Sequence, residues 1–474
     1  MFKIKYLIII LLLQFSSVYC QENIGIANSN YSPTSSVLLN PSSSVDSKVL
    51  WEINLIGASA FFDNNYIFLP NKSVRSILLD PNSTPDPLDK FTASNKYGYS
   101  DISVHGPSVS FNIGKHAFGI NTQIRSVTDI RNFPVHLAKF SFEGFKYAPQ
   151  RGVVYNGSNI KANSMAWGEV GLNYGLILKE KSKGMYMAGI SLKRLFGISH
   201  SGTNIKDITY QVPDTVDVDF IDINAKYGFT APAFNSGSGW AIDLGFTYKK
   251  TLKEVDNYTP YSKINNCRKS EYKYKIGISI LDLGRITNKT EAYYGELKDQ
   301  SGTWEDYQNS VIGSANTRDG KIVNSFIQID NQKREYKAYL PTALSVQYDY
   351  NFENGFYLNA TIIQNLSFFN QLGVIRQDLL AVTPRLELPR FEVSLPISLR
   401  RYIYPSVGLA FRLWNNIIIG TDRLFPLMRN QDLYGMDFYI GIKLAKLYTN
   451  KCKTNQKKNK HKKYTTNDCY FKQY

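Results

Sequence analysis

Apolar and polar positions alternate with a period of two over much of the chain. From 166 to 178, one side carries mostly Val, Leu and Tyr, whereas the other carries Trp, Glu, Gly and Asn. The same split recurs in the segments 186–193, 240–249, 391–400 and 436–444. A period of two places successive side chains on opposite faces of an extended chain, so these segments are predicted β-strands.

The lengths of these strands and of their connections favour a membrane barrel over a soluble β-sandwich. The strands run to about 9 to 11 residues, which crosses a bilayer when tilted. Long and short connections alternate between candidate strands at 48–60, 101–111, 116–125, 166–178 and 185–194. Aromatic residues near strand ends suit the membrane surface: Trp240, Tyr248, Tyr272, Tyr274, Tyr348 and Tyr350. We therefore expect an all-β, antiparallel transmembrane barrel with its apolar face in lipid and its polar face in the lumen.

The number of strands is expected to be 14 or 16. The alternation of loop lengths is interrupted between Asp282 and Pro341, and an additional strand at Lys321–Asp330 would restore it and give 16. The segment Thr303–Thr317 resembles a short helix. An even count places both termini in the periplasm, on the same side as three predicted hairpin turns: Gly114-Lys115, Asn354-Gly355 and Asn415-Asn416.

The first 20 residues have the layout of a secretory signal peptide. Lys3 and Lys5 precede the apolar run Tyr6–Leu13, and cleavage is expected after Cys20. Alternatively, Cys20 is the acylated residue of a lipoprotein, although Tyr19 is unfavourable for that signal. After residue 20 no apolar span reaches the length of a membrane helix, so a helical membrane protein is not expected.

The net charge of +16 is concentrated at the C-terminal end. Residues 446–474 contain nine Lys and one Asp, and nine minus one gives +8. The segment 448–474 is therefore predicted to be a Lys-rich periplasmic tail, either solvated or in contact with anionic lipid or an acidic protein. No nucleic-acid partner is expected. Cys452 and Cys469 can form a disulfide in an oxidising compartment.

Residues that would support catalysis or metal binding are sparse. The five His show no zinc-binding spacing, and the segment 197–202 fails the Gly-x-Ser-x-Gly pattern of a nucleophile elbow. Asp80, Asp86 and Asp89 lie in a Pro-rich loop without the spacing of a calcium loop. We therefore predict a non-enzymatic protein with no cofactor and no metal.

Charged residues on the polar faces of the strands are candidate lumen residues. Asp217 and Asp219 share one side of a predicted strand that also carries Asp222. If that side faces the lumen, these carboxylates can pair with cations on other strands, and such mixed charge packs a barrel interior or tunes passage of a solute. The candidate cations are Lys193, Lys249, Lys273, Lys275 and Arg412.

Several short motifs resemble known barrel families. Residues 35–43, which include Asn40-Pro41-Ser42, are similar to the Asn-Pro-Ala box of long-chain fatty-acid transporter barrels and of the PorV-type barrels of type IX secretion. The closer resemblance, over most of residues 22–447, is to a Bacteroidota family of uncharacterised outer-membrane barrels, some of which carry the OmpA family name. Its marks here are Asn40-Pro41, Gly106-Pro107-Ser108, Arg125-Ser126 and Leu195-Phe196-Gly197.

The resemblance implies an organisation and two classes of function. Residues 21–47 would form a plug-like segment inside a barrel of residues 48–447, although a simple Ser-rich linker would also fit. The protein would then be an outer-membrane channel for small or hydrophobic solutes. Alternatively it is an envelope scaffold or secretion-associated barrel that binds partner proteins. A soluble, secreted β-rich binding module is the third alternative.

Overall fold

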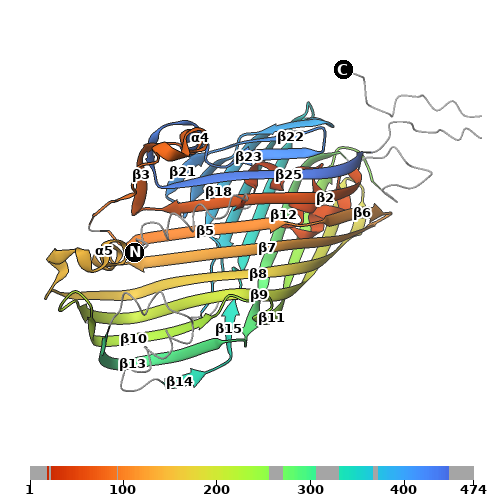
Figure 1. Ribbon diagram of the computed structural model, residues 1–474. Helices are drawn as coiled ribbons and strands as arrows, with labels where there is room; N and C mark the ends of the chain where they lie inside the picture. Colours follow the sequence, from red (N-terminus) through yellow and green to blue (C-terminus); the bar gives the residue numbers. More distant parts are fainter. Residues whose placement is uncertain are drawn as a thin grey trace, which may run out of the picture.

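The computed structural model describes six parts of the chain: residues 19–20, 23–92, 94–255, 271–305, 330–366 and 372–447. Within them the strands form a closed antiparallel barrel of 14 strands, with further strands outside it. Figure 1 shows the long strands running side by side, with their colours following the order of the sequence. The predicted fold class is confirmed, and the smaller of the two expected strand counts is the observed one.

Several of the 14 wall positions are shared by two or three consecutive strands. In chain order the wall comprises β2 (Val49–Asn64), β5 (Lys96–His105) with β6 (Ser108–Ile113), β7 (His116–Phe133), β8 (Val154–Lys181), β9 (Gly184–Gln211), β10 (Val218–Thr230) with β11 (Gly237–Thr251), β12 (Tyr272–Asn288) with β13 (Ala292–Trp304), β14 (Asp330–Lys333) with β15 (Tyr336–Tyr339) and β16 (Ala343–Asn351), β17 (Phe356–Asn365), β18 (Leu379–Glu387), β19 (Phe391–Ser394) with β20 (Ile397–Arg400), β21 (Tyr404–Val407) with β22 (Leu409–Leu413), β23 (Ile417–Thr421) and β25 (Gly435–Leu447). The barrel closes where β25 pairs with β2.

The interruption expected between Asp282 and Pro341 has a structural explanation. β12 pairs with β11, and β13 pairs with β10, so β12 and β13 occupy one wall position in succession. Residues 321–329 and 306–317, where an additional strand and most of a short helix were predicted, lie outside the described residues, and 303–304 end β13. The interruption in the loop-length pattern therefore arises because two consecutive strands, β12 and β13, together form one bent position of the wall.

The two faces of the wall differ as the alternation predicts. On β8, the outward Leu172 is 57% exposed, whereas the inward Trp167 is 0% exposed. Outward Ile276 on β12 and Ile442 on β25 are likewise exposed, at 43% and 46%. An apolar outer face and a polar inner face are typical of a barrel that sits in lipid. In the described part of the chain, no helix is long and apolar enough to cross a membrane.

The two ends of the barrel are unlike each other. One end, here called the turn end, carries residues 48 and 447 and the three predicted hairpin turns, which follow β6, β16 and β22. At the other end, here called the loop end, β7, β8, β9, β10 and β13 project beyond the shorter strands β16–β23 (Figure 1). Which end faces the periplasm stays a prediction.

Smaller elements lie at the loop end and before the first wall strand. Those at the loop end are β3 (Ile67–Lys72), α4 (Val74–Leu79), η2 (Pro81–Ser83), β4 (Leu88–Asp89), α5 (Val135–Glu143), η3 (Gly144–Lys146), η4 (Ala148–Gln150), α8 (Leu424–Met428) and β24 (Gln431–Leu433). Before β2 come β1 (Tyr19–Cys20), α2 (Ile24–Ala27), α3 (Pro33–Ser36) and η1 (Pro41–Asp46).

Candidate functional site

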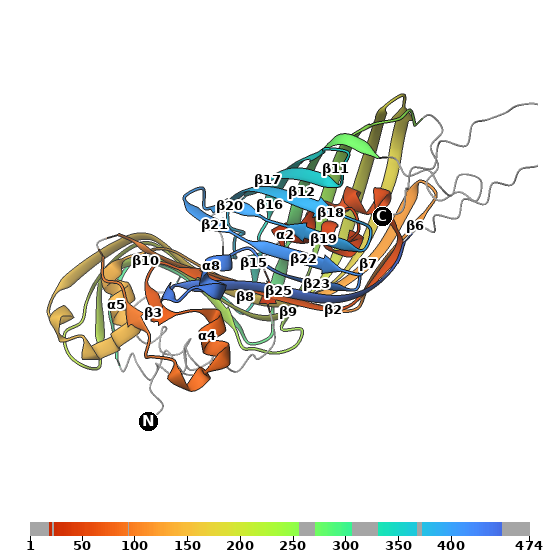
Figure 2. The ribbon, with the colours of Figure 1, turned by 90° about the horizontal axis from the view of Figure 1, so that it is seen from above.

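Residues 23–48, here called the N-terminal segment, contact strands on several sides of the barrel. α2 contacts β18, β22 and β23, α3 contacts β2 and β6, and η1 contacts β7, β8, β9 and β11. Figure 2 shows α2 among the strands rather than on their outer surface. Ile24, Ile26, Leu39 and Val45 are buried there. The segment therefore occupies the interior of the barrel.

Polar side chains of the barrel accept hydrogen bonds from backbone and side-chain groups of this segment. The Ile24 N–H donates to Asp422 at 3.1 Å, and the Thr34 N–H donates to Glu52 at 3.0 Å. The Ser29 hydroxyl donates to Glu392 at 2.6 Å. Short irregular helices leave N–H and C=O groups without internal partners. The wall supplies these partners, which is why so short a segment can be ordered inside a barrel.

The Asn-Pro-Ser box sits at the centre of these contacts. The Asn40 side chain accepts from the Ser42 N–H at 3.0 Å, which caps η1, and donates to the Gln347 side chain at 3.0 Å. The Ser42 hydroxyl lies 2.7 Å from the Thr247 hydroxyl. Pro41, as the first residue of η1, has no N–H that needs a partner. Each residue of the box therefore helps to form η1 or to attach it to the wall.

A row of glycines on the wall makes room for the box. Gly175 on β8, Gly189 on β9 and Gly245 on β11 are direct register partners across three neighbouring strands. A Cβ atom on Gly189 would lie 2.4 Å from the Pro41 carbonyl carbon, and one on Gly245 would lie 2.8 Å from Pro41 Cδ. Gly in a strand interior often marks close approach of another backbone. Glycines at inward positions of neighbouring strands could have indicated where the box packs against the wall. The sequence analysis did not predict this contact from them.

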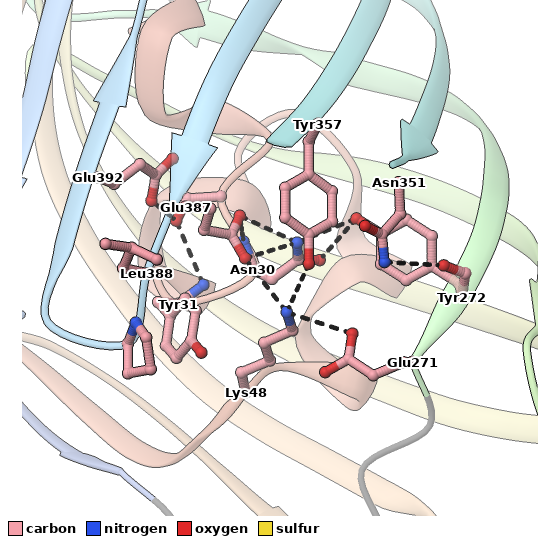
Figure 3. Close-up of polar contacts among 12 residues, drawn as sticks. Asn30, Tyr31, Lys48, Glu271, Tyr272, Asn351, Tyr357, Glu387, Leu388 and Glu392 are labelled. Atoms are coloured by element: carbon pink, nitrogen blue, oxygen red, sulfur yellow. Dashed lines mark hydrogen bonds and ion pairs between the residues drawn. The ribbon is translucent and has the colours of Figure 1, made fainter. Parts of the chain in front are cut away.

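At the turn end, a cluster of charged and aromatic residues joins the N-terminal segment to the wall (Figure 3). The Lys48 ammonium lies 3.4 Å from both Glu387 and Glu271, and donates to the Tyr357 hydroxyl at 2.9 Å. The Asn30 amide donates to Glu387 at 2.9 Å. Burial lowers the pKa of Lys48, but the two carboxylates outweigh it and hold that pKa well above its usual value. Lys48 therefore stays charged and bound at neutral pH.

A second buried cluster surrounds Asp282 in the middle of the barrel. Asp282 has φ +53°, at a register shift of β12, which turns its carboxylate inward beside Leu281. It accepts from Arg125 at 2.8 Å, Lys193 at 2.7 Å and Arg376 at 2.6 Å. Arg376 comes from the described segment 372–378 before β18, so this segment reaches into the lumen. This buried carboxylate and its three cations join four parts of the chain: β12, β7, β9 and the segment before β18.

The structure brings some of the predicted lumen residues together and separates others. Lys193, Lys249 and Arg412 are buried, with Lys249 placed over the Tyr272 ring at 5.4 Å and Arg412 bound to Glu392 at 2.8 Å. Lys275 donates to Asn30 at 2.8 Å. Lys273 instead pairs with Glu353 at the turn end, with 40% of its side chain exposed.

Four of these cations form ion pairs with carboxylates other than Asp217 and Asp219. Lys193 binds Asp243 and Asp282, both at 2.7 Å, rather than Asp217 or Asp219. Asp219 accepts from the Thr303 hydroxyl at 2.7 Å on the projecting part of β10, and the Asp217 N–H donates to Asp214. Asp219 lies on the projecting part of β10, away from the lumen cations, which explains the difference. Cys452 and Cys469 lie outside the described residues.

The wall is interrupted beside β15. β16 and β17 pair as far as Ala343 and Asn365, and among the described residues β15 has no strand from β17 beside it. Segment 372–374 takes that place, because the Tyr339 N–H donates to Leu372 O at 3.1 Å. Pro341, between β15 and β16, has no N–H to donate to a ladder. A bent strand and an inward loop therefore replace regular pairing at this point.

One cavity of about 290 Å3 lies at this interruption. Trp240 and Leu283 line it, and these side chains occupy outward positions at 56% and 41% exposure. Asn204 and Lys161 line it as well, and Asn204 is an inward residue that accepts from Asn163. Residues of both faces of the wall therefore line a single cavity. We refer to it as the wall cavity.

No group of His, Cys, Asp and Glu residues in the described ranges is arranged to hold a metal ion. In the same ranges Asp89, from the acidic loop, binds Lys139 at 3.0 Å and Tyr66 at 3.2 Å. That carboxylate is therefore engaged in joining β4 to α5.

The model of a family of unknown function (DUF5723) matches residues 41–422. This match covers well over half of the chain. The chain belongs to this family. No curated protein sequence matches it. The expected Bacteroidota origin and OmpA naming stay predictions.

Solved structures of hydrocarbon channels show a distant likeness. The chain is 9% identical to the toluene transporter TbuX of Ralstonia pickettii, with a TM-score of 0.41 over 88% of this chain and 94% of that one. It is 11% identical to a mutant of the monoaromatic hydrocarbon channel TodX, with a TM-score of 0.43 over 90% of this chain and 97% of that one. It is 8% identical to a FadL homologue of Pseudomonas aeruginosa, with a TM-score of 0.31 over 91% of this chain and 99% of that one. At such values the likeness says nothing of what this chain binds.

Proposed function

We propose that this protein lets small apolar solutes cross the outer membrane by way of the wall cavity. The observation that supports this function is the lining of that cavity by residues of both faces, Trp240 and Leu283 outside and Asn204 and Lys161 inside. An apolar solute that reaches such an opening gains free energy by moving from water into lipid. Passage of an apolar solute through the wall cavity therefore needs no energy source.

The route along the barrel axis is much less favourable. The N-terminal segment contacts wall strands at the turn end, and the Asp282 cluster with Arg376 lies in the middle. An apolar solute on this route would have to displace buried ion pairs, and breaking one such pair costs about 3 to 5 kcal/mol. We therefore assign the N-terminal segment the role of a plug that directs solutes to the wall cavity.

A dye-uptake assay tests this function. In cells that display the protein, N-phenyl-1-naphthylamine should reach the membrane several-fold faster than in cells without it. Leu366, which lines the wall cavity, is the residue to enlarge, and Leu366→Trp should return uptake to the background rate. Leu172→Trp, at an outward position of β8 with 57% exposure, is the matched control and should behave as wild type. Equal uptake by wild type and Leu366→Trp would contradict the function.

A scaffold role is the second candidate, and one observation favours it. The projecting strands carry α5 on their inner side, where Phe140 and Phe145 pack with Ile160, Ile208 and Tyr210. This packing makes the projecting wall a firm surface for a partner protein. If dye uptake does not depend on the protein while crosslinking recovers envelope proteins bound to the projecting strands, the scaffold role replaces the channel.

A further inference from the structure

Two arginines flank a tryptophan on the outer face of the wall. Trp240 on β11 is the register partner of Arg194 on β9 and of Arg285 on β12. Register partners of neighbouring strands point to the same face, and Trp240 and Arg285 are both exposed. We refer to these three outward residues as the arginine row; their strands run side by side in Figure 1.

On the side of the turn end, the arginine row borders the apolar belt of the wall. The next outward register partners are all apolar: Leu192, Ile242 and Leu283, followed by Ile190, Leu244 and Ile280. The belt ends in four tyrosines whose rings follow one another at centroid distances of 5.1, 6.3 and 6.1 Å: Tyr186, Tyr248, Tyr274 and Tyr348.

The spacing between the arginine row and the tyrosines fits the thickness of a membrane. Trp240 and Tyr248 lie eight residues apart on one strand (248 − 240 = 8), which is roughly 26 Å along it. Because barrel strands tilt by about 35 to 45°, this length gives a height of roughly 20 Å, against about 25 Å for the apolar band of outer-membrane barrels. Beyond the arginine row, the next register partners on β11, β12 and β15 are polar: Ser238, Thr287 and Lys337. The arginine row therefore lies at the boundary between lipid tails and headgroups.

Neither arginine forms an ion pair with a carboxylate of the described residues. The Arg194 guanidinium lies 5.2 Å from the Trp240 ring centre and donates to Gly239 O at 3.3 Å. Exposed lysines elsewhere on the barrel do pair with carboxylates, as Lys273 does with Glu353 at 3.0 Å. Cations without a counter-ion at a membrane boundary attract anionic headgroups.

The chemistry of these side chains selects phosphate at that boundary. An arginine that faces lipid is costly at the bilayer centre and much less costly near the headgroups. Its guanidinium binds phosphate through two parallel hydrogen bonds, and Trp is favoured at headgroup level. Because β11 separates β9 from β12, the backbones of the two arginines lie about 10 Å apart, or two strand spacings. Both long side chains can therefore reach one lipid head placed over Trp240.

We infer that the arginine row binds the phosphate head of a membrane lipid, in the leaflet at the loop end, while the acyl chains lie along Leu192 and Leu244. Continuity of the row with the apolar belt favours a lipid of the bilayer over free phosphate. Trp240 and Arg285 also border the wall cavity, but the lipid stays on the outer surface. The inference does not rest on the proposed function, because the lipid is a fixed neighbour of the wall and not a solute that crosses it.

Native mass spectrometry of the full chain in detergent tests the inference, with dioleoyl phosphatidic acid and dioleoyl phosphatidylcholine as probes. The two lipids have the same chains, and choline shields the phosphate of the second. Wild type should bind phosphatidic acid at least about tenfold more tightly, which is the usual effect of one hydrogen bond to a charged group. The double variant Arg194→Gln/Arg285→Gln should lose this preference. The double variant Arg194→Lys/Arg285→Lys, which keeps the charge without the paired hydrogen bonds, should retain only part of it.

The double variant Arg75→Gln/Arg429→Gln is the matched control. It removes the same charge from two exposed arginines at the loop end, on α4 and at the end of α8, and should bind both probes as wild type does. An equal loss of preference in this control, or equal affinity of wild type for the two probes, would overturn the inference. If the Gln variant of the arginine row does not fold, the Lys variant decides, and an undiminished preference there would overturn the inference as well.

Two further arms fix the ligand and its place. An excess of inorganic phosphate should leave the bound lipid in place, because the acyl chains supply much of its affinity; displacement would overturn a lipid as the ligand. Leu366→Trp, which fills the wall cavity, should leave the preference for phosphatidic acid unchanged, and its loss would place the head inside the cavity and overturn the inference.

The same variants separate the inference from the proposed function. If the lipid preference depends on the arginine row but Leu366→Trp does not slow the dye, the proposed function alone fails. If Leu366→Trp slows the dye but the Gln variant of the arginine row keeps its lipid preference, this inference alone fails.

Discussion

The fit of the Asn-Pro-Ser box against the glycine row makes Gly189→Ala the most informative substitution. Its new Cβ atom would lie 2.4 Å from both the Pro41 carbonyl carbon and the Ser42 nitrogen. Both are backbone atoms of a buried turn, so no flexible side chain can move aside. The N-terminal segment must shift away from β9 or the strand must deform.

The expected cost follows from this overlap. Overpacking a well-packed interior costs about 1 to 3 kcal/mol. A shift of the segment also weakens the 2.7 Å contact between Ser42 and Thr247 and the 3.0 Å hydrogen bond from Asn40 to Gln347, each worth about 1 kcal/mol. Local opening of the segment should therefore become more frequent by about 5- to 150-fold from the overlap alone.

Hydrogen exchange of residues 23–48, followed by mass spectrometry, measures this opening. Gly189→Ala should speed exchange in this segment, while the wall strands exchange as in wild type. Gly168→Ala on β8 is the matched control, because a Cβ at Gly168 has no heavy atom within 4 Å. If Gly189→Ala and Gly168→Ala exchange alike, the glycine row does not hold the box and the packing argument is refuted.

Three further perturbations test other parts of the structure. Asp282→Asn removes the carboxylate that three buried cations share, although Lys193 keeps Asp243 and Arg125 keeps Asp101. It should lower the free energy of unfolding in urea by about 3 kcal/mol, the lower end of the cost of breaking a buried pair; Asp219→Asn should not, and equal losses would contradict the cluster's role. The pKa of Lys48 is raised in the folded protein. Its ion pairs therefore contribute their full stabilisation below the pKa of the unfolded chain, about 10.4, and this stabilisation is lost as the pH rises through the pKa of the folded protein. Limited proteolysis of the N-terminal segment should therefore stay constant from pH 7 to 10, and Lys48→Met should speed it at pH 7; a loss of protection already at pH 8 would argue against the ion pair. Deletion of 452–474 should leave recovery of the protein in the membrane fraction unchanged, and its loss would show that the tail is needed for assembly.

The barrel itself could be predicted because the alternation of side chains reports directly on the two faces of a strand. On β8 every second residue from Val170 to Leu178 is outward, and the intervening Asn173 and Ile177 are buried. Such a pattern depends only on local geometry. The interior position of the Asn-Pro-Ser box was an expectation from resemblance rather than from alternation.

The partners inside the lumen could not be predicted in the same way. Alternation says that Lys193 points inward, but the choice of Asp243 and Asp282 over Asp219 depends on strand register and on how far each strand projects. Asp282 itself points inward only because of the register shift at its positive φ. The wall cavity depends on the end of β17 and on an inward loop, neither of which has a periodic signal.

The central claim, that solutes pass through the wall cavity, is tested most directly by locating a bound solute. Crystals of the full chain soaked with 1-bromooctane would reveal the bromine by its anomalous scattering. The account predicts a bromine site between Trp240, Leu340 and Ile375. Bromine found only along the barrel axis beside the N-terminal segment, or only on the outer surface, would contradict it.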